Sequence, residues 1–241
     1  MKIAVIVLFN KAGFLLTLSA VRGISNNSWV MEVECVVADV NCANNKVFMY
    51  ELFLHNFNSK VKLTEEEEAL IKTYLTPKKL RKKQYLLQET DVCKFMAFVE
   101  KGALRAYSVD EIGKEHIIQF ALEGWTISDL YSFLTGEPAT YNIDALEDSE
   151  LVLISKAAHE DLLLKLPKYE TYFRIQVTGA YIAMQKRLTS IISSPLEERY
   201  KNLTALYPTI VERVPQHMIA SYMGLQPETL SRIRRKIATK K

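Results

Sequence analysis

The stretch IASYMGLQPETLSRIRRKI, residues 219–237, predicts two short helices joined by a tight turn. Gly224 stands where such a turn needs a positive φ, which glycine adopts without strain. Pro227 suits the first position of the second helix, where its missing N–H costs no hydrogen bond. Ala220 is small enough for the two helices to cross closely. The apolar residues of the stretch predict a small core between the helices: Ile219, Met223, Leu225, Leu230 and Ile233. The spacing is typical of a helix-turn-helix.

The second of these helices, from Pro227 to about Lys236, has one apolar and one polar face. An exposed Glu can accept a hydrogen bond from cytosine N4, and an Arg can bind guanine O6 and N7 in the major groove. Residues 232–241 contain six Lys or Arg and no acid, which favours contact with phosphates. The candidate DNA contacts are therefore Gln226, Glu228, Thr229, Ser231, Arg232, Arg235 and Lys236.

A plainer interpretation of the same residues stays open. Glu228 and Arg232 are four residues apart and could form only a surface ion pair, while the basic tail could serve solubility. The complete set of turn and core residues favours DNA binding over this alternative.

A second pattern precedes this segment. Apolar or aromatic residues recur at spacings of three and four from Tyr169 to Ile191, which predicts one helix over residues 168–192, about 37 Å long. So long a stripe suits a seam with an identical helix of a second copy. Packing along the chain's own β domain is the alternative. The candidate dimerisation residues are Phe173, Val177, Ala180, Met184 and Leu188.

The middle of the chain reads as short strands. Residues 84–120 alternate in β-like runs, with hairpin signals at 100–102 and 110–113. Further strands are expected near 141–145 and 151–154. Short strands at regular spacing favour an antiparallel β-roll or jelly roll.

Two charged runs lie just before these strands. Thr64 followed by four Glu predicts an N-cap with acids in the first helical turn. The basic run from Lys78 to Lys83 favours an exposed edge strand, because lysines on an edge discourage pairing with other chains. Contact with phosphates ranks second for this run.

The first 48 residues lack this organisation. Residues 1–23 hold two short apolar runs interrupted by Asn10 and Lys11, too broken for the roughly 20 apolar residues of a spanning helix. A signal peptide would need one apolar core and a better cleavage site. We favour a natural start at Met31 or Met49, with residues 1–48 a misassigned or disordered extension.

Composition excludes several classes of function. The net charge of only +3 does not by itself indicate binding to nucleic acid. The three cysteines form no CxxC, which disfavours a disulfide framework or a four-thiolate cluster and fits a cytoplasmic protein. His116 stands alone on its expected strand, so a cupin-like metal site is not expected. No GxSxG, HExxH or phosphate-binding loop is present. We therefore expect no enzyme and no membrane partner.

Residues 63–238 resemble the Crp/Fnr family of bacterial transcription regulators. Residues 226–233 are similar to the family's recognition helix, with its Glu and Arg retained as Glu228 and Arg232, although Pro227 replaces a common Arg. The interval 208–215 is short for the wing of many relatives. The resemblance implies an α+β fold: an antiparallel β-roll sensor domain at 49–166, a dimerisation helix at 167–193 and a helix-turn-helix domain at 194–241. It also implies a homodimer on a near-palindromic site in double-stranded DNA, with RNA polymerase as a further candidate partner.

The effector pocket departs from the family. In the cassette that binds the cyclic phosphate, Ser128 and Asp129 replace Gly and Glu, and Ala139 and Thr140 replace Arg and Ser. Residues 115–155 contain eight acids and no Lys or Arg, which repels an anionic ligand. We therefore predict no cofactor and no cyclic AMP binding in the usual way, with another small effector open. The candidate pocket residues are Thr126, Ser128, Asp129, Ala139 and Thr140. The alternative function is a signalling module that binds a small molecule or cyclic nucleotide without direct DNA readout.

Overall fold

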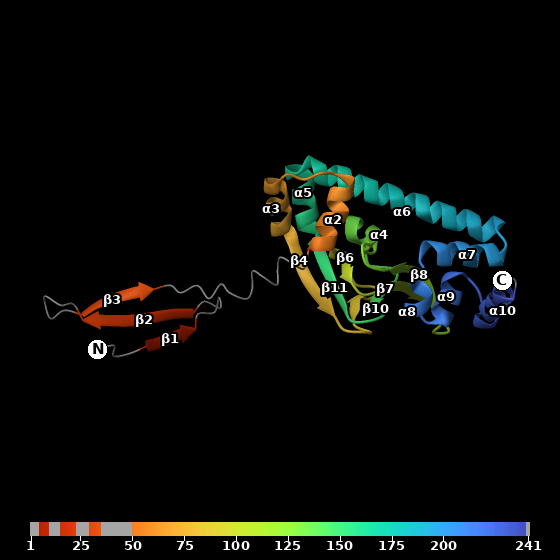
Figure 1. Cartoon of the computed structure of the whole chain (residues 1–241), viewed down its shortest axis with the longest axis horizontal. Helices are drawn as coiled ribbons and strands as arrows, with labels where there is room; N and C mark the ends of the chain where they lie inside the picture. The colour runs from red at the N-terminus through yellow and green to blue at the C-terminus, as the bar shows by residue number, and fades with distance from the viewer. Residues whose placement is uncertain (1–4, 10–14, 23–28, 35–49, 240–241) are drawn as a thin grey trace. The chain divides into compact units, whose positions relative to one another are not determined.

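The computed structural model describes residues 5–9, 15–22, 29–34 and 50–239 (Figure 1). The chain divides into two compact units, Met1–Phe48 and Met49–Lys241. The described part of the first unit is a three-stranded antiparallel sheet of β1 (Val5–Phe9), β2 (Leu15–Arg22) and β3 (Trp29–Glu34). The natural start at Met31 or Met49 remains a prediction.

The second unit begins with two helices, α2 (Glu51–Lys60) and α3 (Glu65–Tyr74). The hydroxyl of Thr64 accepts the N–H of Glu67 at 3.2 Å, and the Glu67 carboxylate accepts the N–H of Thr64 at 2.7 Å. This reciprocal pair satisfies two N–H groups that the helix start leaves without partners. The predicted N-cap at Thr64 is confirmed.

Two four-stranded antiparallel sheets form the β-roll that follows. One has the order β4-β11-β6-β9 and the other β5-β10-β7-β8. Their apolar side chains meet in one core, which the first turns of α6 also join. The strands are β4 (Leu75–Leu80), β5 (Tyr85–Leu87), β6 (Phe95–Lys101), β7 (Leu104–Val109), β8 (Glu115–Ala121), β9 (Thr126–Ile127), β10 (Asn142–Ala145) and β11 (Ser149–Ser155). Helix α4 (Leu130–Thr135) lies between β9 and β10 in the chain. The predicted antiparallel roll is confirmed.

The basic run begins on an edge strand, as predicted. Strand β4 lies at the edge of its sheet beside β11, and it carries Lys78 and Lys79. Lys79 pairs with Glu150 of β11 at 3.0 Å. The remaining basic residues lie in the turn between β4 and β5.

One of the two predicted hairpins is wrong. Residues 110–113 do turn β7 back onto β8, and these strands pair along their length. At residues 100–102, however, the chain turns from one sheet to the other, so β6 and β7 belong to different sheets and do not pair. A turn signal marks a change of direction and does not show which strands then pair.

Helix α6 (Pro167–Ser193) agrees with the predicted span of 168–192. It follows α5 (Lys156–Lys165), and its first turns pack on the roll through the buried Tyr169 and Tyr172. The helix then continues along the molecule towards α7 (Figure 1).

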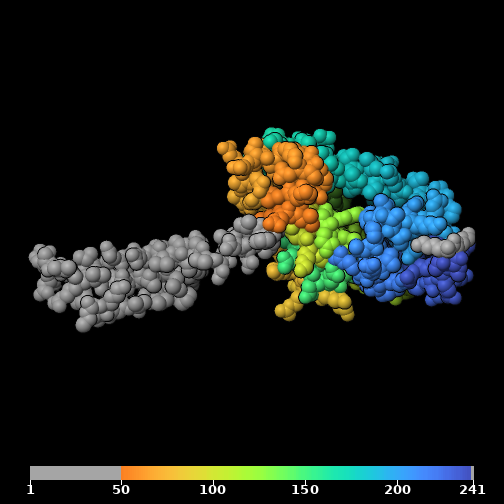
Figure 2. Space-filling model, in the orientation of Figure 1, coloured from red at the N-terminus to blue at the C-terminus, as the bar shows by residue number. Residues whose placement is uncertain are grey.

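Four short helices end the chain and share a second core with the roll. They are α7 (Leu196–Leu206), α8 (Ile210–Arg213), α9 (Gln216–Tyr222) and α10 (Pro227–Ala238). The roll contributes Tyr107, Ile117 and Phe120 to this core. Figure 2 shows these helices, in blue, in close contact with the green strands. None of the described helices combines the length and apolar character needed to cross a membrane.

The corner at Gly102 yields a test of the fold. Gly102 has a φ of +103°, and a Cβ built there would lie 2.2 Å from the Ser149 Oγ and 2.8 Å from its Cα. Gly113 has a φ of +80° but nothing within 4 Å of such a Cβ, so it is the matched control. Both alanine variants suffer the backbone strain of about 1–2 kcal/mol. We expect Gly102→Ala to lose about 1–3 kcal/mol more of the free energy of unfolding, because of overpacking. Urea unfolding of both variants measures this, and equal losses would contradict the close approach.

Candidate functional site

The turn between α9 and α10 is closed by two backbone hydrogen bonds. Gly224 has a φ of +69°, its N–H donates to the Ser221 carbonyl at 2.9 Å, and the Leu225 N–H donates to the Ala220 carbonyl at 2.8 Å. These bonds satisfy carbonyls that the end of α9 would otherwise leave unpaired. The predicted local core is confirmed: Ile219, Ala220, Met223, Leu230 and Ile233 are buried, and Leu225 is partly buried against them.

The candidate DNA contacts lie on the outer surface of α10 and at its N-cap. Gln226 is the N-cap residue and makes no side-chain capping bond. Thr229 is half-buried, and the other six candidates are exposed: Gln226, Glu228, Ser231, Arg232, Arg235 and Lys236. Leu230 and Ile233 point away from this surface into the core. The structure therefore brings all seven candidates onto one short helix.

The contacts among these candidates are few. Within residues 50–239 neither Arg232 nor Arg235 forms an ion pair, so the predicted alternative of a Glu228–Arg232 pair is not realised there. The Arg232 guanidinium lies 3.4 Å from the Thr229 hydroxyl. Lys236 instead reaches α7, where its ammonium lies 2.6 Å from Glu197. The two arginine side chains are thus presented to solvent.

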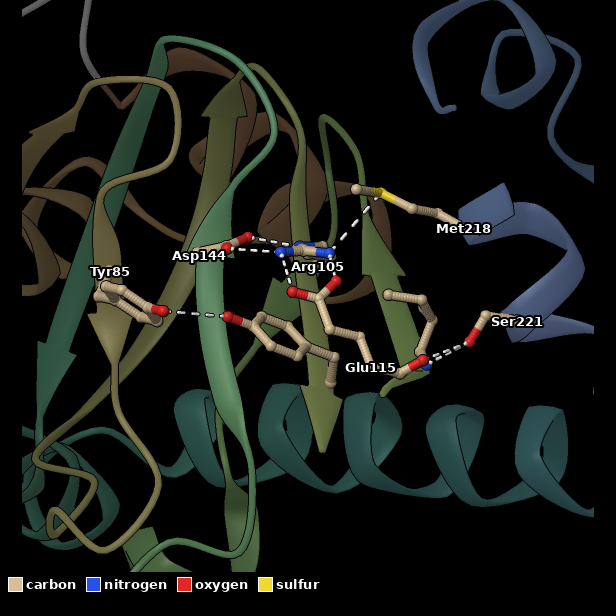
Figure 3. Close-up of polar contacts among 8 residues, drawn as sticks. Tyr85, Arg105, Glu115, Asp144, Met218 and Ser221 are labelled. Atoms are coloured by element: carbon tan, nitrogen blue, oxygen red, sulfur yellow. Dashed lines mark hydrogen bonds and ion pairs between the residues drawn. The ribbon is translucent and has the colours of Figure 1, made fainter. Parts of the chain in front are cut away.

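Helix α9 is held against the outer edge of β8. The Ser221 hydroxyl accepts the Ile117 N–H at 3.0 Å and donates to the Glu115 carbonyl at 3.1 Å (Figure 3). Arg187 of α6 donates to the carbonyls of Ile118 and Tyr222. Its guanidinium also lies 3.9 Å from the centre of the Tyr222 ring. These contacts position the first helix of the pair relative to the roll.

A buried arginine supports the same contact from inside the sheet. The Arg105 side chain of β7 donates to both Asp144 oxygens, at 2.8 and 2.9 Å, and to Glu115 (Figure 3). It also lies 3.8 Å from the Met218 sulfur of α9. Burial lowers the pKa of Arg105, but its hydrogen bonds to Asp144 and Glu115 outweigh burial and raise the pKa above its ordinary value. The guanidinium is therefore a fixed positive charge beside α9.

A second arginine fastens α8 to the roll. Arg213 donates to both oxygens of Glu123, at 2.7 and 2.8 Å, and to Glu147. The hydrogen bonds with Glu123 and Glu147 raise the pKa of Arg213. Sequence reasoning missed Arg187, Arg213 and Ser221, because nothing local marks them: their partners lie 35 to 106 positions away.

The predicted effector residues do not form one pocket. A cavity of about 170 Å³ lies between the roll and the first half of α6, and Thr126 and Ser128 line it, whereas Asp129, Ala139 and Thr140 do not. The other lining side chains are mostly apolar or aromatic: Phe53, Met96, Phe98, Leu130, Val152, Ile154, Tyr169, Tyr172, Phe173, Val177 and Ala180, with Gln119 and Gln176. Of the α6 residues of this wall, Phe173, Val177 and Ala180 were candidate dimerisation residues, with packing on the chain's own β domain as the alternative.

Asp129 has a structural role instead. It is buried, and its carboxylate accepts the N–H of Ser132 at the start of α4, at 3.0 Å, and the N–H of Thr140, at 3.1 Å. Ala139 is buried too, and its N–H donates to the Asp91 carbonyl at 2.8 Å. Thr140 is exposed. In the described chain, the amides of Ala139 and Thr140 are therefore already engaged by acceptors of the protein itself.

The candidate dimerisation stripe divides into two parts. Phe173 and Val177 are half-buried at the cavity, and Ala180 lines it although it is exposed. Met184 and Leu188 are 66% and 58% exposed. The alternative of packing on the chain's own roll therefore describes the first part of the stripe and not the second.

Comparisons with known proteins agree with this architecture. The family model of the cyclic nucleotide-binding domain matches residues 77–165. The fumarate and nitrate reduction regulatory protein of Vibrio cholerae is 26% identical over 172 residues. That match covers 65% of this chain and 66% of the relative, just under two thirds of its length.

Solved structures show the same fold at low sequence identity. FixK2 from Bradyrhizobium japonicum has a TM-score of 0.58 at 19% identity, covering 69% of this chain and 85% of that one. The c-di-GMP responsive regulator CLP of Xanthomonas campestris has a TM-score of 0.58 at 12% identity, covering 72% and 90%. A Crp/Fnr-family regulator from Eubacterium rectale has a TM-score of 0.57 at 17% identity, covering 74% and 85%. The Vibrio cholerae relative is a regulatory protein, CLP is a global regulator, and the Eubacterium rectale protein is described as a transcriptional regulator. The chain is therefore similar in sequence to this regulatory protein and in fold to structures of the Crp/Fnr type, and its residues 77–165 match the cyclic nucleotide-binding domain.

Proposed function

We propose that this protein is a homodimeric transcription regulator that reads DNA with α10. The observation that carries the proposal is the two-sided character of this helix. Its apolar side chains are buried against α9, while Glu228, Arg232 and Arg235 are exposed. A helix that is packed on one face and exposes polar and cationic side chains on the other fits the major groove of DNA.

The exposed residues would contact different parts of the DNA. Glu228 and Arg232 would contact base edges, since their side chains match cytosine N4 and guanine O6 and N7. Gln226, Thr229, Ser231, Arg235 and Lys236 would contact the backbone or neighbouring bases. Lys236 would exchange its exposed ion pair with Glu197 for a phosphate, a small loss because such pairs are worth about 0–1 kcal/mol.

The second half of α6 supports a homodimer. Beyond the cavity its apolar side chains are exposed, with Met184, Leu188 and Ile192 each more than half accessible. A contiguous apolar face of this kind marks an interaction surface. A two-fold pair would place two α10 helices about 34 Å apart on a near-palindromic operator. Contact with RNA polymerase remains a prediction.

The sensor half would not bind cyclic AMP in the usual way. Ala139 stands where the resemblance expects the phosphate-binding Arg, and its side chain can form no charge-assisted hydrogen bond. The Asp129 carboxylate accepts a hydrogen bond from the Thr140 amide and adds a negative charge beside this amide. Both features oppose a cyclic phosphate.

The first prediction concerns base reading. Arg232→Ala should weaken binding to the operator by about 1–3 kcal/mol and relax the preference at one base pair. Arg174→Ala, which removes an exposed arginine from α6, is the matched control and should change neither. A genome-wide binding experiment supplies the operator, and fluorescence anisotropy on single-base variants measures the effect. If Arg232→Ala discriminates among these variants as the wild type does, Arg232 is not a reading residue. A wild-type protein without salt-dependent affinity for duplex DNA would favour the signalling-module alternative.

The second prediction concerns the dimer. The double variant Met184→Glu/Leu188→Glu should raise the dimer dissociation constant at least about a hundredfold, because each buried side chain of this size contributes about 1.5–3 kcal/mol. The double variant Gln185→Glu/Thr189→Glu adds the same charges at the same spacing beside the stripe, and should leave most of the dimer intact. Sedimentation equilibrium measures both. Equal dissociation of the two variants would remove the stripe from the interface.

The third prediction concerns the ligand. Calorimetry with cyclic AMP should show no micromolar binding to the full chain, because the phosphate would meet Asp129 and no arginine. A micromolar dissociation constant would overturn this part of the proposal and leave DNA binding untouched.

A further inference from the structure

The cavity beneath α6 has the size of a small-molecule site. It measures about 170 Å³ and lies between the inner face of the roll and the helix that carries the exposed apolar stripe. An apolar cavity of about 150 Å³ is large enough to hold benzene. We propose that this cavity binds a small uncharged molecule of mainly apolar character, about the size of one substituted aromatic ring.

The walls determine the chemical class. None of the described side chains that line the cavity is charged. The large surfaces come from rings and aliphatic groups such as Phe98, Val152, Tyr169 and Phe173. An ion placed among them would lose its hydration without gaining a partner, at a large free-energy cost. An uncharged apolar molecule would instead gain from leaving water.

The polar side chains of Gln176 and Tyr172 on the wall already have partners. The Gln176 carbonyl accepts a hydrogen bond from the Lys60 ammonium at 2.6 Å, and the Gln176 amide donates to the Tyr172 hydroxyl at 3.0 Å. The Tyr172 hydroxyl in turn donates to Asn56 at 3.1 Å. Lys60 itself does not line the cavity, and its ammonium lies 5.2 Å from the centre of the Tyr172 ring. Thr126 and Ser128 remain as hydroxyl groups that could accept or donate one hydrogen bond to a ligand.

The position of the cavity gives the ligand a possible regulatory effect. Val177 and Ala180 line it and also belong to the stripe proposed for the dimer. A bound molecule would therefore contact the roll and the dimer helix together. This regulatory meaning rests on the proposed function, whereas the binding site itself does not.

The test uses two probes of equal size and different charge. Toluene and benzoate are titrated into the full chain, and NMR follows the methyl groups of Val152, Ile154 and Val177. We expect saturable shifts with toluene and at least about tenfold weaker binding of benzoate, since its carboxylate finds no partner. Equal affinities would overturn the assigned chemical class, and no saturable binding of toluene would overturn the site.

Variants locate the binding. Val177→Phe fills the cavity from α6 and should weaken toluene binding by about tenfold or more. If this variant fails to fold, Ala180→Phe fills the cavity from the next turn of the helix and should have the same effect. Ile175→Phe lies on the same helix away from the cavity, and is the control that should bind as the wild type does. Binding unaffected by both filling variants would place toluene elsewhere and refute the proposal. Operator binding is measured separately, so a failure of the DNA proposal would not be mistaken for a failure of this one.

Discussion

The outer edge of β8 is the constraint on which the arrangement of the second unit depends. The strand ends the order β5-β10-β7-β8, so one row of its backbone groups has no neighbouring strand. Such an edge invites pairing with another chain unless it is covered. Here the Ser221 hydroxyl of α9 accepts the Ile117 N–H and donates to the Glu115 carbonyl. Arg187 of α6 donates to the Ile118 carbonyl. Helices from the end of the chain therefore complete the roll.

This coverage makes β8 a shared wall. Gln119 of β8 lines the cavity beneath α6, while Ile117 and Phe120 of the same strand belong to the core of α7–α10. Arg105 binds Glu115 at one end of the strand, and Arg213 binds Glu123 just beyond the other. Arg105 and Asp144 are both buried, so losing the Arg105 side chain would leave the buried Asp144 carboxylate without its cationic partner. The cavity and α9 are thus joined by one packed strand and not by a flexible linker, and packed elements transmit displacement.

The predictions that succeeded rest on contacts between residues close in sequence. The capping of α3 by Thr64, the turn at Gly224 and the span of α6 each involve residues within one or two helical turns, which the spacing of residue types reveals. The predictions that failed needed knowledge of distant partners. The turn at 100–102 joins two sheets because β6 pairs with β11, some 50 positions later. Local residue types do not encode such pairings.

The candidate effector residues have different surroundings, which their local sequence also does not reveal. Ser128 and Asp129 are adjacent in sequence, yet one side chain lines the cavity and the other caps α4. The resemblance indicated that the cassette lacks its arginine. It did not reveal that the Asp129 carboxylate accepts the N–H of Thr140. That contact requires residues 129 and 140 to meet across α4.

The role of Asp129 bears on what the roll can sense. A cyclic phosphate would have to displace this carboxylate from two backbone amides, and the displaced charge would then repel the phosphate at close range. Because the protein's own anion already satisfies these amides, we propose that the α4 end of the roll does not bind anionic ligands. The uncharged cavity between the roll and α6 is proposed to bind a different class of molecule. A ligand there would contact α6 directly, so in this chain the link from sensing to the dimer would run through the helix rather than through the phosphate cassette.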